Sequence, residues 1–136
     1  MSMKAQERSP GTTGLDLRIK RAYEPASRSD GTRFLVERVW PRRVLRQEMA
    51  IEAWLRDAAP STALREWLGN DRTRWTEYVR RYHRELDGNP LAWQNILAAA
   101  RKGPVTLVYN VEHPARNTAA ALKAYLDKLE ARSAAR

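Results

Sequence analysis

Two apolar stretches of this sequence run directly into side chains that could bind or transform a small molecule. The first covers residues 34–36 and the second covers residues 105–109. The side chains at their ends are Arg38, Trp40 and Arg42 after the first, and Tyr109, Asn110, Glu112, His113, Arg116 and Asn117 at the end of the second. The carboxyl ends of parallel strands meet at one edge of an open α/β sheet, where ligands commonly bind. The two patterns therefore predict a single strand-end site with one wall from each stretch.

These residue types favour a small anionic ligand. A planar guanidinium binds a carboxylate or phosphate through two parallel hydrogen bonds, and the first N–H groups of a helix attract anions. The expected ligand-binding residues are Arg38, Trp40, Arg42, Asn110, Arg116 and Asn117. The candidates for proton transfer, if a reaction takes place, are Tyr109, Glu112 and His113. Residue types alone do not indicate which reaction that would be.

Each candidate also has a purely structural explanation. Arg38 is equally well explained as half of an ion pair at the strand end, with Glu37, Glu52 or Glu112 as its partner. Trp40 and Pro41 suit a rigid packed turn, and His113 suits a solvated or helix-capping position. Asn117 suits the cap of the last helix. These alternatives stay open at the level of sequence.

Several kinds of chemistry are excluded or disfavoured by composition. The chain has no cysteine, which rules out disulfides, thiolate nucleophiles and cysteine-bound zinc. Glu112 and His113 are adjacent, which is not the spacing of metal ligands, so we expect no metal and no cofactor. The sequence has no phosphate-binding or dinucleotide-binding glycine pattern and no Gly-x-Ser-x-Gly motif.

The charge balance raises the question of a polyanionic partner. The chain has 136 residues and a net charge of +9, with 20 arginines and 5 lysines. The basic residues are scattered rather than grouped in a run, which favours solvated helix faces over a phosphate-binding groove. Nucleic-acid binding and a non-catalytic interaction module are kept as alternatives to the anionic-ligand site. Apolar runs are too short to span a membrane and no apolar signal segment is seen, so we expect a cytoplasmic protein.

Hydrophobic periodicity predicts strands at each end of the chain and helices between them. Alternation over residues 15–23 indicates a half-exposed strand, and the short loop at 24–31 predicts that the first two strands are antiparallel neighbours. Residues 51–58 suit a helix or a strand. Ser61 and Gly69 suit the two ends of one helix, further helices begin near Asn70 or Asp71 and at Asn89-Pro90, and a last helix carries Leu122, Tyr125, Leu126 and Leu129. The stripe of Trp54, Trp67, Trp75, Tyr78, Tyr82 and Trp93 is expected in the core rather than on a base-stacking surface.

These elements predict an α/β fold. We expect a small mixed or parallel sheet of about four strands, with helices on both faces, in a Rossmann-like or rhodanese-like three-layer arrangement. Residues 15–130 are expected to form a single domain. A disordered tail is expected at 1–14 and a frayed end at 131–136.

The chain resembles the short, YeaO-like branch of the family called domain of unknown function 488. The matching stretches are 33–42 (RFLVERVWPR), 54–61 (WLRDAAPS), 64–67 (LREW), 81–86 (RYHREL) and 104–109 (PVTLVY), with Asn117 beyond them. The resemblance implies a single-domain cytoplasmic α/β protein with a pocket between the segments of Arg38, Trp40 and Arg42 and those of Tyr109 and Asn117. It also implies a strand within 51–56. It implies no activity, because the family is uncharacterised.

Departures from the family pattern bear on activity. The arrangement is loosely similar to rhodanese-type domains, in which a late strand delivers a catalytic cysteine that this chain lacks. Arg43 stands where the family usually has glycine, Asn70 where histidine is common, and Arg116 where histidine usually precedes the asparagine. If those residues matter for activity, this member is altered or inactive.

Overall fold

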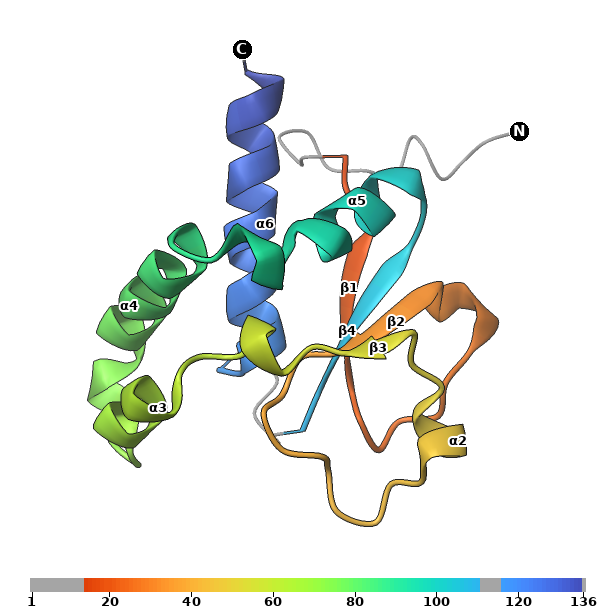
Figure 1. Cartoon of the computed structure of the whole chain (residues 1–136), viewed down its shortest axis with the longest axis horizontal. Coiled ribbons are helices and arrows are strands. Elements are labelled where there is room, and N and C mark those ends of the chain that lie inside the picture. The colour runs from red at the N-terminus through yellow and green to blue at the C-terminus, as the bar shows by residue number, and fades with distance from the viewer. Residues whose placement is uncertain (1–13, 111–115, 136) are drawn as a thin grey trace.

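The computed structural model describes residues 14–110 and 116–135, and within these ranges the chain forms one four-stranded parallel sheet (Figure 1). The strands are β1 (Leu17–Arg21), β2 (Thr32–Leu35), β3 (Ala53–Trp54) and β4 (Val105–Tyr109). Their order across the sheet is β1-β4-β2-β3, and every pairing is parallel. The expected α/β class and the expected parallel pairing of the strands at 34–36 and 105–109 are confirmed.

Helices and single helical turns connect the strands. In chain order they are η1 (Arg28–Asp30), α2 (Arg46–Met49), η2 (Arg56–Ala58), α3 (Thr62–Leu68), η3 (Arg72–Arg74), α4 (Trp75–Asp87), η4 (Pro90–Ala92), α5 (Gln94–Lys102) and α6 (Thr118–Ala134). Ser61 caps α3 by accepting the N–H of Leu64, Gly69 follows the last residue of α3, and Asp71 caps η3. The predicted helix boundaries in this part of the chain are confirmed, because capping depends on local residue chemistry.

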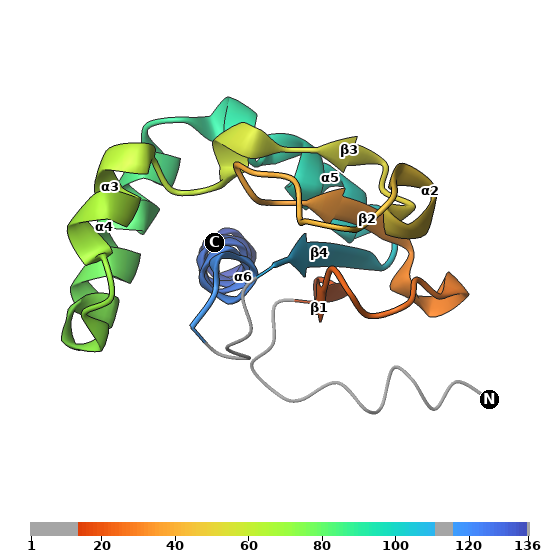
Figure 2. The same cartoon turned by 90° about the horizontal axis from the view of Figure 1, so that it is seen from below.

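The sheet separates two apolar clusters. Phe34 and Leu107 face the main core, which α4, α5 and α6 cover. Leu35 and Val108 face the other side, where Met49 of α2 packs against them. Figures 1 and 2 show α2 on the face opposite α5 and α6, and Figure 2 shows α6 between α4 and β4. This is the expected three-layer arrangement, with a thin layer on the side of α2.

The predicted antiparallel pairing of the first two strands is wrong. β1 and β2 are not neighbours, because β4 lies between them and pairs with both in parallel. Residues 22–31 return the chain to the start of β2 and can span about 33 Å when extended. To reach the start of β2, the chain must run back along a five-residue strand and cross two strand spacings, a distance of roughly 26 Å. The loop can therefore make the connection without a long crossover helix.

Residues 51–58, ambiguous by periodicity, form a short strand followed by a helical turn. β3 pairs with the end of β2 through Phe34 with Ala53 and Leu35 with Trp54. η2 follows directly, and the carbonyl of Ala58 accepts the hydroxyl of Tyr82 from α4. The strand implied by the family resemblance is therefore present.

Predictions for the chain ends are only partly covered by the described residues. Residues 1–13 of the predicted tail lie outside them. At the other end α6 continues to Ala134, and fraying of residues 131–136 stays a prediction.

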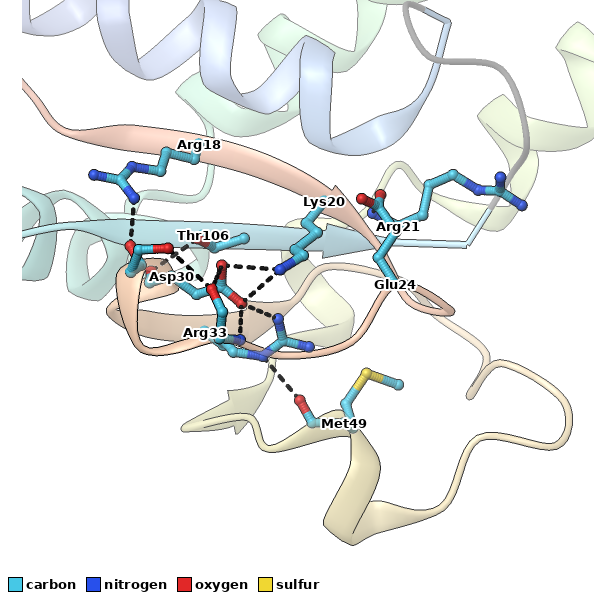
Figure 3. Close-up of polar contacts among 10 residues, drawn as sticks. Arg18, Lys20, Arg21, Glu24, Asp30, Arg33, Met49 and Thr106 are labelled. Carbon is cyan, nitrogen blue, oxygen red and sulfur yellow. Dashed lines mark hydrogen bonds and ion pairs between the residues drawn. The ribbon is translucent and has the colours of Figure 1, made fainter.

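A buried ionic cluster on the side of α2 joins β1, β2 and β4 (Figure 3). The Asp30 carboxylate accepts hydrogen bonds from Lys20 of β1 (3.1 Å) and Arg33 of β2 (2.7 Å). The Asp30 carbonyl accepts the hydroxyl of Thr106 of β4 (2.8 Å), and Arg33 Nε donates to the carbonyl of Met49 in α2 (2.9 Å). Asp30 and Arg33 are 5% and 4% exposed, so these contacts are shielded from water.

The electrostatics of this cluster favour the ionised carboxylate. Burial by itself would raise the pKa of Asp30, but hydrogen bonds from the Ser27 N–H, Lys20 and Arg33 outweigh it and lower the pKa from 3.8 to about 2. Because the folded state binds this proton more weakly than the unfolded state, the cluster stabilises the fold above about pH 4. That stabilisation is lost as the pH falls toward 2.

Gly31 brings the start of β2 against the start of β4. Its φ is +65°, and a Cβ at this position would lie 2.1 Å from the carbonyl oxygen of Pro104. The same oxygen accepts the N–H of Thr32 (3.0 Å), which fixes the close approach. Only glycine fits here, for both conformational and steric reasons.

We predict that Gly31→Ala lowers the free energy of unfolding by about 3 kcal/mol or more, because the Cβ must displace backbone. The matched control is Gly88→Ala, where the added Cβ meets only ordinary contacts near 3.7 Å and φ is −84°. The control should change stability by less than about 1 kcal/mol. Urea unfolding of both variants measures the difference, and equal midpoints would contradict the close-packing explanation.

We predict that Asp30→Asn lowers the free energy of unfolding at pH 7 by roughly 2–3 kcal/mol, the order of magnitude that corresponds to the lowered pKa of Asp30. The difference between wild type and variant should shrink as the pH falls from 5 to 2. Asp57→Asn is the control, because that side chain is 82% exposed. Denaturant unfolding at several pH values provides the measurement, and a difference independent of pH would show that Asp30 is not held ionised.

Candidate functional site

A cleft opens at the carboxyl ends of the strands, where β2 and β4 lie side by side. The chain leaves β2 toward α2 on one face, whereas after β4 it enters α6 on the other face (Figure 2). Such a switch point is the usual ligand crevice of an open α/β sheet. The cleft has a volume of about 490 Å³ and is lined by Glu37, Thr62, Arg65, Glu66, Leu68, Gly69, Trp75, Tyr78, Arg116, Asn117 and Thr118.

Glu37 is fixed at the inner end of this cleft. The β2–β4 ladder continues to the bond from Val36 N–H to the Val108 carbonyl (3.1 Å), and the Glu37 carboxylate then accepts the N–H of Asn110 (2.9 Å). Its main-chain carbonyl accepts the indole N–H of Trp54 (2.6 Å). Burial raises the pKa of Glu37, opposed by the Asn110 hydrogen bond and by the charge of Arg65. Among the described residues only Oε2 has a hydrogen-bond partner, so Oε1 is available to a ligand.

Two further polar groups line the cleft without a polar partner in the described part of the chain. Arg65, on α3, has no carboxylate within ion-pair distance among residues 14–110 and 116–135, although its charge acts on Glu37 and Tyr78. The Tyr78 side chain is 5% exposed, yet its hydroxyl forms no hydrogen bond to a described residue. Burial raises the pKa of Tyr78 to about 12, so the phenol is neutral at physiological pH and can donate a hydrogen bond.

The remaining walls come from α6 and from an aromatic pair. Asn117 is 2% exposed and caps α6, because its side-chain oxygen accepts the N–H of Ala120 (2.8 Å). The ring centroids of Trp75 and Tyr78 are 5.2 Å apart, and the two rings form an apolar side of the cleft. An adjoining depression of about 430 Å³ shares Leu68, Gly69, Trp75 and Arg116 with the cleft and adds Asn70, Asp71 and Arg72.

The structure brings only part of the predicted ligand set to this cleft. Arg116 and Asn117 line it, whereas Asn110 does not line it and contacts the lining residue Glu37 through its backbone N–H. Asn117 also fulfils the capping role that the sequence left open. Tyr109 is buried in the main core, where burial and the charge of Glu24 raise its pKa, and it is not a lining residue. Glu112 and His113 lie outside the described residues.

Arg38, which was predicted to form part of the first wall of the site, packs against the loop before α3 instead. Arg38 donates to the carbonyl of Pro60 (2.7 Å) and lies 3.8 Å from Asp57. The structural explanation left open for Arg38 therefore has Asp57 as its carboxylate, in place of Glu37 or Glu52, whereas Glu112 lies outside the described residues. These contacts hold the loop before α3 against the end of β2. Arg38 does not line the cleft.

Trp40 and Arg42 also lie away from the cleft lining. The Trp40 indole donates to the carbonyl of Val44 (2.7 Å) and meets Trp54 edge to face at 5.3 Å, and Pro41 is fully buried. The packed-turn explanation of this dipeptide is confirmed. The Arg42 side chain is exposed, and its backbone carbonyl accepts the hydroxyl of Tyr23 (2.9 Å).

The residues that sequence reasoning missed are Glu37, Arg65 and Tyr78. Glu37 directly follows the apolar strand, and Arg65 lies in the LREW stretch that carries the family resemblance, so both had a signal. Tyr78 had none, because its helical spacing with Tyr82 and Leu86 equally describes the core. The side chains of Tyr78, Tyr82 and Leu86 are all buried.

The residues that the structure describes contain neither a metal-binding cluster nor a helix that could span a membrane. Residues 14–110 and 116–135 contain no group of three or more histidine, aspartate or glutamate side chains placed to hold a metal ion. In the same ranges no helix has the length and apolar character needed to cross a bilayer.

The fold and the cleft define a small parallel α/β protein with a polar strand-end cavity. The chain belongs to the DUF488-N3i family, described as the inactive DUF488-N3 subclade, whose sequence model matches residues 16–136. It is 31% identical to the uncharacterized protein YeaO of Escherichia coli over 115 residues, 85% of this chain and 100% of YeaO. It is 34% identical to the uncharacterized protein Rv3073c of Mycobacterium tuberculosis over 82% of this chain and 93% of that protein. No solved structure matches the chain.

The departures from the family pattern fall in two places. Asn70 and Arg116 line the same depression beside the cleft. Arg43 lies in the turn after Pro41 with φ +64°, a left-handed conformation that costs an L-residue other than glycine roughly 1–2 kcal/mol. The glycine usual at this position therefore has a conformational explanation.

We predict that Arg43→Gly raises the free energy of unfolding by about 0.5–1 kcal/mol, because relief of the positive φ exceeds the entropy that glycine adds to the unfolded chain. Arg42→Gly is the matched control, since Arg42 is the neighbouring arginine, is also exposed and has no positive φ. The control should be neutral or destabilising by a similar amount. Chemical denaturation measures both, and a destabilised Arg43→Gly variant would mean that the arginine side chain itself stabilises the turn.

Proposed function

We propose that this chain is a cytoplasmic binding protein for a small anionic ligand, held in the strand-end cleft by Arg65 and Arg116. One observation carries the proposal. Three polar groups, Arg65, the Tyr78 hydroxyl and Glu37 Oε1, converge on one cavity without a polar partner among the described residues. A few polar groups that converge beside apolar and aromatic side chains are typical of a ligand site.

The basic residues of the cleft support an anion beside them, and the carboxylates of Glu37 and Glu66 line the same cleft. The guanidinium of Arg65 is always ionised and can hold a carboxylate or phosphate through two hydrogen bonds. Arg116 lines both the cleft and the adjoining depression. The positive end of the 17-residue helix α6 begins beside it at Thr118 and adds to the same potential.

A binding role for the cleft is better supported than a catalytic role. The chain has no cysteine for nucleophilic chemistry, and its family is described as an inactive subclade. Tyr109, a candidate for proton transfer, is absent from the cleft lining. The polar groups that do line the cleft are suited to orient a ligand.

Nucleic-acid binding remains the second candidate because of a groove between α4 and α6. This groove, of about 360 Å³, is lined by Arg80, Arg84, Lys128 and Arg132 together with Asp87. Within the described residues Lys128 and Arg132 have no carboxylate at ion-pair distance, whereas Arg80 and Arg84 share Glu77. The groove therefore has a net positive charge that a phosphate backbone could neutralise.

We predict that a thermal-shift screen of small carboxylates, phosphates and nucleotides finds ligands that stabilise the wild type but not Arg65→Ala, since a lost charged hydrogen bond costs about 1.5–3 kcal/mol of binding. Arg42→Ala is the matched control and should keep the full shift, because Arg42 does not line the cleft.

If binding of a ligand requires Arg42 but not Arg65, the site lies at the residues that follow β2, as the sequence predicted. If no small anion binds while an oligonucleotide does, and Lys128→Glu abolishes that binding, nucleic-acid binding is the function instead.

A further inference from the structure

The cleft presents a hydrogen-bond acceptor as well as anion-binding groups. Glu37 lines the cleft, and its Oε2 is occupied by the N–H of Asn110, whereas Oε1 has no partner in the described part of the chain. An anion bound at Arg65 without any donor of its own would leave this carboxylate oxygen desolvated and unpaired. Such a ligand would bind against a penalty.

We infer that the ligand carries a hydroxyl or ammonium donor beside its anionic group, so that an α-hydroxy or α-amino acid fits and a simple carboxylate does not. This inference rests on the proposed function and names the ligand class for the same site. The donor pairs with Glu37 Oε1, and the carboxylate pairs with Arg65 and the Tyr78 hydroxyl.

The three groups belong to residues that line one cavity. The charges of Glu37 and Arg65 both act on the Tyr78 hydroxyl, and that of Arg65 acts on Glu37. A cavity of about 490 Å³ is roughly 8 Å across if taken as a cube, the scale of a single amino acid with a large side chain.

The apolar side of the cleft selects the rest of the ligand. Leu68 and the Trp75–Tyr78 ring pair line the cavity beside the polar groups. Aromatic rings pack well edge to face or offset against such a pair. An aromatic side chain on the hydroxy or amino acid therefore fills the space that the polar contacts leave.

Three probes that differ only in the donor test this inference: L-phenylalanine, L-3-phenyllactate and 3-phenylpropionate. Calorimetric titration of the full wild-type chain should show the first two binding at least about tenfold more tightly than the third, the expected gain from a charged hydrogen bond. Glu37→Gln should reduce that preference to less than about threefold. Glu66→Gln, which alters another cleft carboxylate, should preserve it.

The outcomes separate this inference from the proposed function. If 3-phenylpropionate binds as tightly as the other two and Arg65→Ala abolishes its binding, the anion site stands and the donor requirement is overturned. If none of the three binds, or if Arg65→Ala leaves binding unchanged, both are overturned for this ligand class. The ranking on the wild type decides the point even if Glu37→Gln fails to fold.

Discussion

The Asp30 carboxylate is the contact on which the arrangement of this sheet depends. It holds Lys20 and Arg33, while the carbonyl of the same residue holds Thr106, so one residue contacts β1, β2 and β4 at once. A buried ion pair gains little net stability after desolvation, but removing one partner leaves an uncompensated charge. The cluster is therefore best understood as fixing which strands are neighbours. The close approach of Gly31 to Pro104 adds a steric condition at the same end of the sheet.

The strand order set in this way creates the cleft at the opposite end. With β4 inserted between β1 and β2, the backbone N–H of Asn110 emerges beside Glu37, and the carboxylate completes the ladder where the strands stop. The chain then diverges to opposite faces, and the side chains of α3 and α4 meet the start of α6 over the gap. One topology thus produces both the ionic cluster at one end of the strands and the cleft at the other.

Local elements were largely predictable from sequence. Ser61, Gly69, Asp71 and Asn117 mark helix ends through short-range hydrogen bonds and backbone preference, which depend on neighbouring residues alone. The pairing of β1 was not predictable, because its partner β4 is nearly ninety residues away and loop length alone suggested an antiparallel hairpin. The structure has a cleft at the strand ends, where the sequence placed its candidate site, but Arg38, Trp40 and Arg42 do not line it. Arg38 and Trp40 are the most suggestive residues of the first motif, and they hold loops by donating to main-chain carbonyls.

The sequence by itself determined the α/β class, the helix boundaries and the absence of cysteine chemistry, since these follow from periodicity, capping residues and composition. Only the tertiary structure decided that β4 separates β1 from β2, that Arg38 is used for packing, and that Glu37, Arg65 and Tyr78 share one cavity. The physical reason is that a side chain's role depends on which distant groups satisfy its hydrogen bonds. That outcome is fixed by long-range packing and has no signature in the spacing of residues along the chain.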